Sequence, residues 1–200
     1  MNDKQSTSLS GLRVLAMSAD GADLSKLIAG LEQAKVEKAT PVTSVADLKL
    51  AFDKGDTDAV LISISSTTST DILAEIQQIA GACSCPTGLF LDSKVDVNLG
   101  EIIDAGICTV VVDGLAPKRI PRLLETTVYR YNKMRGLQIQ LEEALSALEE
   151  RKLIDRAKGV LIEQRSISEP EAYKLLRQAA MNKNCKISDI AQTIIIASEV

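Results

Sequence analysis

Short aliphatic runs alternate with amphipathic stretches over the first 115 residues of the chain. The aliphatic runs are typical of strands buried on both faces, and they predict strands at residues 12–17, 41–45, 58–64, 86–91 and 107–112. The stretches that follow have apolar positions three and four residues apart, and they predict helices at residues 22–34, 45–54, 70–81 and 95–105. Strands that alternate with helices form a parallel sheet covered on both faces, so we expect a doubly wound α/β domain with the flavodoxin-like strand order.

From residue 118 to 164 the sequence is compatible with one long helix, interrupted only by Pro121 in its first turn and by Gly136. Apolar residues recur there at steps of three and four, which is the spacing of a short coiled coil. This seam consists of Met134, Leu137, Leu141, Ala144 and Leu148. We therefore expect a coiled-coil helix that pairs in a homodimer, and a helix that only connects two domains of a monomer is the alternative.

Two further helices are predicted after the long one. Ser168 and Glu171 have the spacing of a capping box, with Pro170 in the first turn, and they predict a helix over residues 168–181. A polar break follows, and residues 187–198 predict a last helix. Together with the end of the long helix they form an all-α three-helix unit. The predicted divisions of the chain are a sheet domain at 11–118, a helical coiled-coil linker at 119–147 and a helical domain at 148–200.

Composition removes several kinds of chemistry. The chain has no histidine, which excludes histidine-based triads, histidine phosphotransfer and histidine metal centres. The four cysteines include no C-x-x-C, so we predict no metal site and no cofactor. Residues 1–118 have 9 Lys+Arg and 16 Asp+Glu, whereas residues 119–200 have 14 and 11, so an acidic part precedes a mildly basic one. With a polar start and no apolar run of membrane length, we expect a cytoplasmic protein with no membrane partner.

Polar residues follow the predicted strands at the edge where ligands of parallel sheets bind. They are Asp20, Ser63, Asp92 and Asp113. Their order resembles the response-regulator receiver domain, in which an aspartate ends the third strand as phosphoacceptor and a lysine follows the fifth. Here Ser63 takes the acceptor position and Asp113 the lysine position. The resemblance therefore implies a degenerate pseudo-receiver, a docking domain without phosphorylation. The three carboxylates could hold a divalent cation, but we expect solvated loop residues.

Basic and aromatic side chains flank the apolar faces of the last helices. Arg151, Lys158 and Arg165 are seven residues apart and form a stripe along the long helix. Tyr173 and Arg177 are four apart on the next helix, and a tyrosine ring beside a guanidinium is a surface on which an unstacked base can lie. The alternative is that Tyr173 seals the edge of the core and Arg177 pairs with an acidic neighbour.

A family signature runs through all three helices. Its residues here are Glu150, Arg151, Lys152, Ile154, Ala157, Lys158, Gly159 and Leu161, then Glu171, Ala172, Tyr173, Leu176, Arg177, Ala180 and Met181, then Ile190 and Ala191. This pattern resembles the ANTAR domain, the RNA-binding module of transcription antitermination regulators. The layout of pseudo-receiver, long helix and ANTAR domain resembles the AmiR/NasT class. Residues 112–115 (VDGL) are most similar to its nitrate-responsive NasT branch.

The resemblance implies a regulator that binds stem-loops in a leader mRNA and prevents intrinsic termination, in nitrate or nitrite assimilation genes. The positions that match the signature as RNA contacts are Arg151, Lys158, Tyr173 and Arg177, and we add Arg156 and Lys183 as phosphate contacts because of their charge. The degenerate receiver favours control by a sequestering sensor protein, a nitrate/nitrite sensor of the NasS type, over phosphorylation.

No enzymatic activity and no catalytic residue are predicted. Two alternatives stay open: a two-domain signalling adaptor whose C-terminal helices bind protein, and a response regulator phosphorylated in an unconventional way.

Overall fold

The computed structural model describes residues 9–65, 74, 80, 85–95 and 97–198. The helix predicted at 70–81 lies outside the described residues, apart from two positions. The chain divides into two compact units, Met1–Arg135 and Gly136–Val200, and each is described by itself. No helix in the described ranges is long and apolar enough to cross a membrane.

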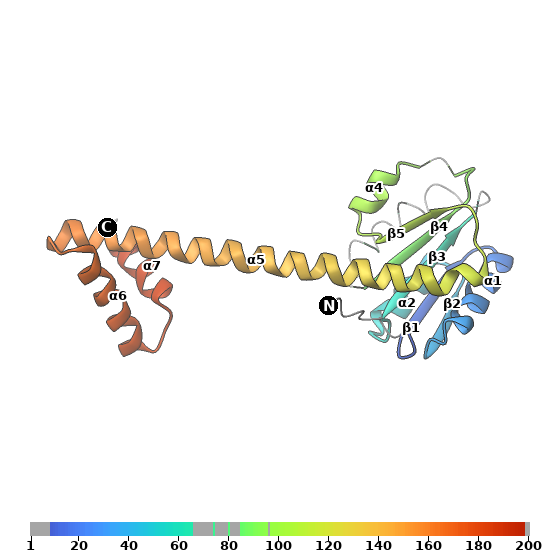
Figure 1. Cartoon of the computed structure of the whole chain (residues 1–200), viewed down its shortest axis with the longest axis horizontal. Coiled ribbons are helices and arrows are strands. Elements are labelled where there is room, and N and C mark those ends of the chain that lie inside the picture. Colours follow the sequence, from blue (N-terminus) through green and yellow to red (C-terminus); the bar gives the residue numbers. More distant parts are fainter. Residues whose placement is uncertain (1–8, 66–73, 75–79, 81–84, 96, 199–200) are drawn as a thin grey trace, which may run out of the picture. The chain divides into compact units, whose positions relative to one another are not determined.

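The first unit is built on a parallel sheet, as the alternating pattern predicts (Figure 1). Its strands are β1 (Arg13–Ser18), β2 (Lys38–Val42), β3 (Ala59–Ile64), β4 (Thr87–Leu91) and β5 (Thr109–Val112). Their order is β2-β1-β3-β4-β5 and every neighbouring pair is parallel, which confirms the flavodoxin-like order. Strand β2 begins at Lys38, earlier than the predicted residue 41, because Lys38 already pairs with Arg13. Pro41 is tolerated within it because β2 is an edge strand.

Helices cover both faces of this sheet. The helices are α1 (Gly21–Gln33), α2 (Val45–Asp53), α4 (Leu99–Asp104) and α5 (Ile120–Arg165), with the 3₁₀ turn η1 (Pro117–Arg119) before α5. Leu48 of α2 and Ile102 of α4 pack in one core cluster, against one set of alternating strand side chains. Leu27 and Leu31 of α1 pack against the other set. Helix α4 is shorter than the predicted 95–105 because Asn98 caps it, accepting a hydrogen bond from the Gly100 N–H.

The start of α5 completes the core of the sheet unit. Ile120, Leu124 and Val128 are buried together with Leu27 and Leu31 of α1. These three α5 residues lie after residue 118, where we expected the sheet domain to end, and the compact unit extends to Arg135. The α5 helix continues without interruption through Gly136, as predicted.

The second unit packs the end of α5 against α6 (Glu169–Lys183) and α7 (Ile187–Ser198). The last helix has the predicted bounds. Helix α6 begins at the predicted capping box, where the Ser168 N–H donates to the Glu171 carboxylate at 2.9 Å, and it ends where Asn184 adopts a left-handed conformation, with φ of 51°. Its buried core consists of Ala157, Leu161, Ala172, Leu176, Ala180, Ile190, Ala191 and Ile195. The four alanines among them let the helices approach closely.

Candidate functional site

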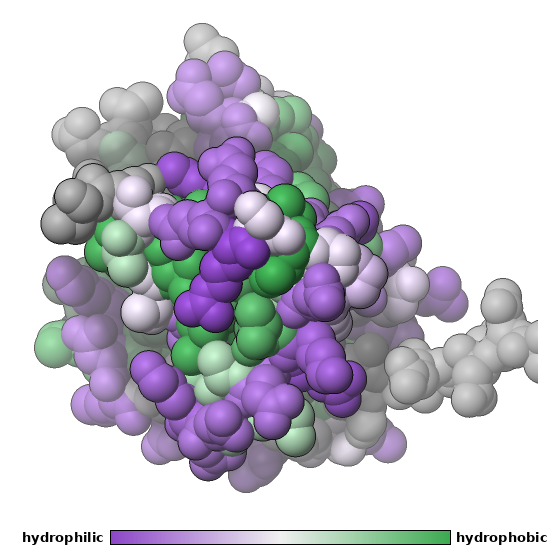
Figure 2. All heavy atoms as spheres, turned by 90° about the vertical axis from the view of Figure 1, so that its left-hand side faces the viewer, coloured by the Kyte–Doolittle hydropathy of each residue, from purple (hydrophilic) through white to green (hydrophobic). Residues whose placement is uncertain are grey.

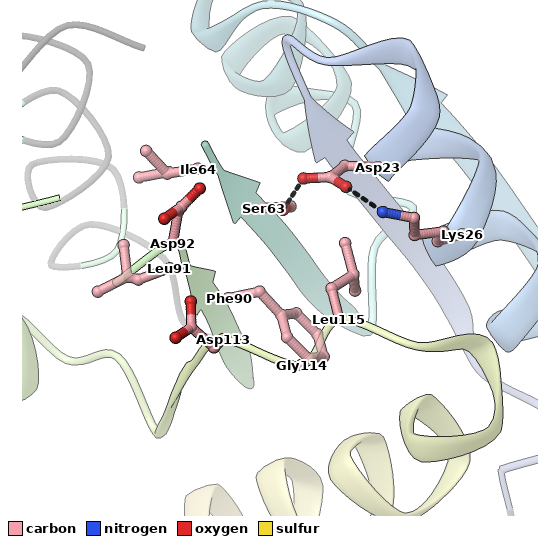
Figure 3. A pocket seen from close by; sticks show the side chains of 10 residues that line it. All are labelled: Asp23, Lys26, Ser63, Ile64, Phe90, Leu91, Asp92, Asp113, Gly114 and Leu115. Carbon is pink, nitrogen blue, oxygen red and sulfur yellow. Dashed lines mark hydrogen bonds and ion pairs between the residues drawn. The ribbon is translucent and has the colours of Figure 1, made fainter. Parts of the chain in front are cut away.

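The strand ends of the sheet unit surround a pocket of about 220 Å³ (Figure 3). Ser63, Asp92 and Asp113, three of the four predicted residues, line it. Asp20 does not, because its carboxylate caps α1 and accepts hydrogen bonds from the Ala22 N–H (2.7 Å) and the Asp23 N–H (3.1 Å). The structure therefore brings three of these positions together and gives the fourth a local role.

Two residues of α1 that the sequence reasoning missed complete this pocket. The Ser63 hydroxyl donates to Asp23 Oδ2 at 3.1 Å, and Lys26 Nζ lies 2.8 Å from Asp23 Oδ1. The hydrogen bond to Asp23 raises the pKa of Lys26. Asp23 and Lys26 are three apart in the first turns of α1, so their helical spacing was the available signal. An ammonium group thus lies near the strand ends, although the residue directly after β5 is Asp113 and not a lysine.

The other two carboxylates hold loops in place. Asp92 Oδ1 accepts from the Lys94 N–H at 3.0 Å, and Asp113 Oδ1 accepts from the Ser93 N–H at 2.8 Å. Figure 3 places Asp92 and Asp113 on the side of the pocket away from Lys26. Within the described residues, no three cysteine or acidic side chains lie close enough together to hold a metal ion. The pocket is thus a hydrogen-bonded junction of loops and α1, with a serine where a receiver has its acceptor.

In the helical unit, the predicted basic residues of α5 share one carboxylate. Lys158 Nζ lies 2.7 Å from Asp155 Oδ1, and Arg151 Nε lies 3.8 Å from Asp155 Oδ2. Lys158 also reaches Glu169 of α6, with Nζ 2.7 Å from Oε1. The hydrogen bonds to Asp155 and Glu169 raise the pKa of Lys158, so it carries its charge at neutral pH. Its side chain is only 15% exposed, whereas that of Arg151 is 82% exposed.

The predicted residues of α6 continue from this bridge. Glu169, Tyr173 and Arg177 are spaced by four, so they form one row along α6. Because Glu169 binds Lys158, this row begins beside α5. Tyr173 is 44% exposed, so part of this residue is accessible to solvent. Arg151 and Lys158 share Asp155, and Lys158 pairs with Glu169, from which Tyr173 and Arg177 follow at steps of four along α6. We refer to Arg151, Lys158, Tyr173 and Arg177 together as the row.

The two residues added for their charge lie elsewhere. Arg156 follows Arg151 by five residues, which is a rotation of about 140° around α5. Lys183 follows Arg177 by six residues and is turned by about 120° from it around α6. Both side chains are exposed, but neither lies in the row.

Figure 2 views the chain from the side of the helical unit and shows hydrophobic atoms bordered and crossed by hydrophilic ones.

The fold and these residues define the class of protein. The sheet unit has the receiver fold: it is similar to the signal receiver domain of a modulated diguanylate cyclase from Desulfovibrio desulfuricans, with a TM-score of 0.53 and 14% identity over 62% of this chain and 98% of that one. A putative pilus assembly-related protein from Burkholderia pseudomallei is similar too, with a TM-score of 0.52 and 18% identity over 61% and 92%. Residues 142–195 match the ANTAR domain. The chain thus carries an ANTAR domain after a receiver-like domain.

Two curated proteins with sequences similar to this chain are named as regulators. The transcriptional regulatory protein PdtaR of Mycobacterium tuberculosis is 28% identical over 92 residues, which are 46% of this chain and 45% of that protein. The nitrate regulatory protein of Klebsiella oxytoca is 35% identical over 83 residues, 42% of this chain and 21% of that protein. Each similarity therefore spans less than half of the relative, and both relatives are regulators.

Proposed function

We propose that this protein is an RNA-binding regulator of transcription antitermination. It binds stem-loops in a leader mRNA and so prevents an intrinsic terminator from forming, and its role is not enzymatic. The observation that carries the proposal is the row of Arg151, Lys158, Tyr173 and Arg177, which lies on the domain that matches ANTAR. The regulatory names of PdtaR and the nitrate regulatory protein support it.

The row has the chemistry that RNA loops require. Single-stranded loops present unstacked bases, which bind aromatic rings and guanidinium planes, and phosphates, which bind basic side chains. Tyr173 and Arg177 are exposed neighbours on α6 and offer the stacking surface. Arg151 and Lys158 offer the cations, with Arg156 and Lys183 as outlying phosphate contacts. Residues 148–200 contain no other aromatic residue, so stacking there depends on Tyr173 and arginine.

The regulator acts as a homodimer that pairs through α5. The seam residues Met134, Leu137, Leu141 and Leu148 are large apolar side chains, each about half exposed or more within one chain. A helix face of this kind loses exposed apolar surface when a second copy packs against it. Two copies would also present two ANTAR domains, which suits a leader with more than one stem-loop.

The receiver-like domain serves as the docking site of a sensor. Leu99 and Ile103 of α4 lie one helical turn apart and are exposed, as is Val112 of β5. Leu99 and Val112 line the same hollow, and Ile103 lies one turn further along α4, so this area offers apolar side chains to a protein partner. In the proposed mechanism, a cytoplasmic nitrate/nitrite sensor of the NasS type holds the regulator here until its ligand appears. Ser63 at the acceptor position argues against control by phosphorylation.

The decisive experiment is transcription in vitro through a nitrate-assimilation leader, with and without the purified protein. We expect the protein to increase readthrough, and a leader without its stem-loops to give no increase. Binding to the hairpin should weaken steeply with salt, because neutralised phosphates release counterions. Unchanged readthrough together with salt-insensitive protein binding would instead support a signalling adaptor.

A further inference from the structure

Lys158 is held between carboxylates that come from two different helices. Asp155 lies three residues before it on α5, and Glu169 is the first residue of α6. Both oxygen atoms are 2.7 Å from Nζ, and the lysine side chain is 15% exposed. In this arrangement two of the three ammonium donors are directed to protein carboxylates. An incoming anion can therefore reach this lysine fully only if one carboxylate leaves it.

Open space lies beside this cluster. A hollow of about 430 Å³ is lined by Arg151, Asp155, Lys158, Gly159, Ile162 and Glu169. A Cβ atom added to Gly159 would meet no atom within 4 Å, so the surface next to Lys158 is unobstructed. Two cations and two carboxylates thus face a space with room for an anion between them.

The two carboxylates differ in how easily they can move. Asp155 has a short side chain and contacts both Arg151 and Lys158 on its own helix. Glu169 has a longer side chain that is 68% exposed, and it pairs with Lys158 across the two helices. Rotation of the Glu169 side chain into solvent requires no movement of either helix. Ion pairs with such exposure are weak, so a phosphate can displace one.

We propose that this hollow binds one backbone phosphate of the RNA, and that Glu169 occupies the place of that phosphate in the free protein. The inference rests on the proposed function, and it assigns to Glu169 the control of RNA binding at the same site. Glu169 is a competitor built into the domain, and its departure frees Lys158 to bind the phosphate beside Arg151. Because Tyr173 and Arg177 follow Glu169 along α6, RNA that reaches them also arrives at the position that Glu169 must leave.

The test measures the affinity of the full chain for a hairpin RNA made from the leader of the readthrough assay, by fluorescence anisotropy at fixed salt. We expect Glu169→Gln to tighten binding by about three- to tenfold, because the neutral amide competes less well for the ammonium. The matched control is Glu163→Gln, which removes one charge from an exposed position of α5, five residues after Lys158 and facing away from it. This control should change the affinity by less than about twofold.

The same substitution in a variant without Lys158 distinguishes competition for that lysine from general repulsion between Glu169 and RNA. In Lys158→Ala protein, Glu169→Gln should have no more effect than Glu163→Gln, because there is no ammonium for which to compete. Equal effects of the two substitutions in the wild-type background would overturn the inference and leave the proposed function standing. A gain from Glu169→Gln that persists without Lys158 would also overturn it. Absence of hairpin binding by the wild-type protein overturns the proposed function, and this inference with it.

Discussion

Asp58 binds one arginine through both of its carboxylate oxygens. Its Oδ2 accepts from the Arg13 backbone N–H at 2.8 Å and from Nε at 3.0 Å, and its Oδ1 accepts from the guanidinium at 3.2 Å. Arg13 begins β1 and Asp58 directly precedes β3, so the pair fixes the amino ends of two central strands. These hydrogen bonds lower the pKa of Asp58 below its ordinary value.

This pair predicts a pH-dependent contribution to stability. Because the pKa of Asp58 is lower in the folded state, its stabilisation is present above the ordinary aspartate range, about pH 4, and is lost as the pH falls through the folded value. Asp58→Asn should therefore lower the midpoint of thermal unfolding by a few degrees at neutral pH. Calorimetry from neutral pH downwards should show the difference between wild type and variant shrink in acid. A difference that stays constant would contradict this assignment.

The row that we propose contacts RNA predicts variants that lose binding without losing the fold. Lys158→Ala and Arg177→Ala should each weaken hairpin binding and reduce the slope of log affinity against log salt by about 1, because each removes one cation from the contact with RNA. Thermal unfolding should change little, because Arg177 is exposed and the two carboxylates that pair with Lys158 are more than half exposed to solvent. The measurement is a salt titration of hairpin affinity for each variant. Full retention of affinity in both variants would disprove the site.

Single residues were predicted best where one helix face decides their position. The spacing of Tyr173 and Arg177 predicted that they share one helix, and both lie on α6; their contact with RNA stays a prediction. Asp23 was missed because its partner, Ser63, is 40 residues away and only the folded sheet brings them together. Glu169 was missed for the same reason, since its contact with Lys158 depends on how α6 turns back along α5. Tertiary contacts of this kind leave no periodic signal.

At the scale of elements, α1 and α5 meet at a glycine. A Cβ atom on Gly30 would lie within 3 Å of three Ile120 side-chain atoms, and Ile120 is fully buried. Gly136, in the middle of α5, has open space around the corresponding position. The two glycines can therefore be compared directly: both lie within helices, but packing requires the absence of a side chain only at Gly30.

Alanine substitutions at these glycines should have opposite effects. Gly30→Ala should cost about 1–3 kcal/mol in the free energy of unfolding, because the added methyl group forces α1 and α5 apart. Gly136→Ala should gain roughly 0.5–1 kcal/mol, because alanine favours the helix and meets no neighbour. Urea denaturation of both variants provides the comparison. Equal stability of the two variants would show that the contact between Gly30 and Ile120 does not exclude a methyl group.

The exposed seam of α5 predicts the oligomeric state. Leu141 is 59% exposed in one chain, so Leu141→Lys should leave the fold of each chain intact while placing a charge in the proposed pairing surface. We expect a shift from dimer to monomer in sedimentation equilibrium, together with weaker hairpin binding. Lys133→Ala, at an exposed position of the same helix outside the seam, is the control and should remain dimeric. A monomeric wild-type protein would exclude this mode of assembly.

The hydrophobic period of the sequence predicted which segments are helices and which are strands, and capping residues determined where the helices begin. The bounds of α7 and the start of α6 were predicted closely because their hydrophobic period and capping box agree. Strand β2 was placed late because its polar edge residues carry little of the apolar signal that marks a buried strand. Helix α4 was predicted too long because its cap, Asn98, lies within an otherwise compatible stretch.

At the scale of the whole molecule, one helix contributes to two cores. Ile120, Leu124 and Val128 of α5 are buried in the sheet unit, and Ala157 and Leu161 are buried in the helical unit. The sequence predicted that the end of α5 joins the helical unit, but it did not predict that the start of α5 is buried in the sheet unit. The architecture of a sheet domain followed by helices was nonetheless predictable from the change of hydrophobic period.

This division predicts where the chain can be cut. A fragment of residues 1–135 should unfold cooperatively and bind no hairpin RNA, because it retains the sheet core and lacks the ANTAR domain. A fragment of residues 1–118 should be much less stable, since it loses three buried aliphatic side chains and uncovers those of α1. Thermal unfolding followed by circular dichroism compares them. Equal stability would mean that α5 is dispensable to the sheet unit.

The contribution of α5 to the sheet unit also sets the order of events on the ribosome. All five strands and α1 are synthesised before Ile120, so the sheet can pair while the face that α1 shares with α5 is only partly covered. Coverage of that face is completed only when the first turns of α5 emerge, by which time synthesis has moved into the second half of the chain. A nascent chain stalled between β5 and α5 therefore exposes an apolar sheet surface, and it is the stage of synthesis at which this protein most needs a chaperone.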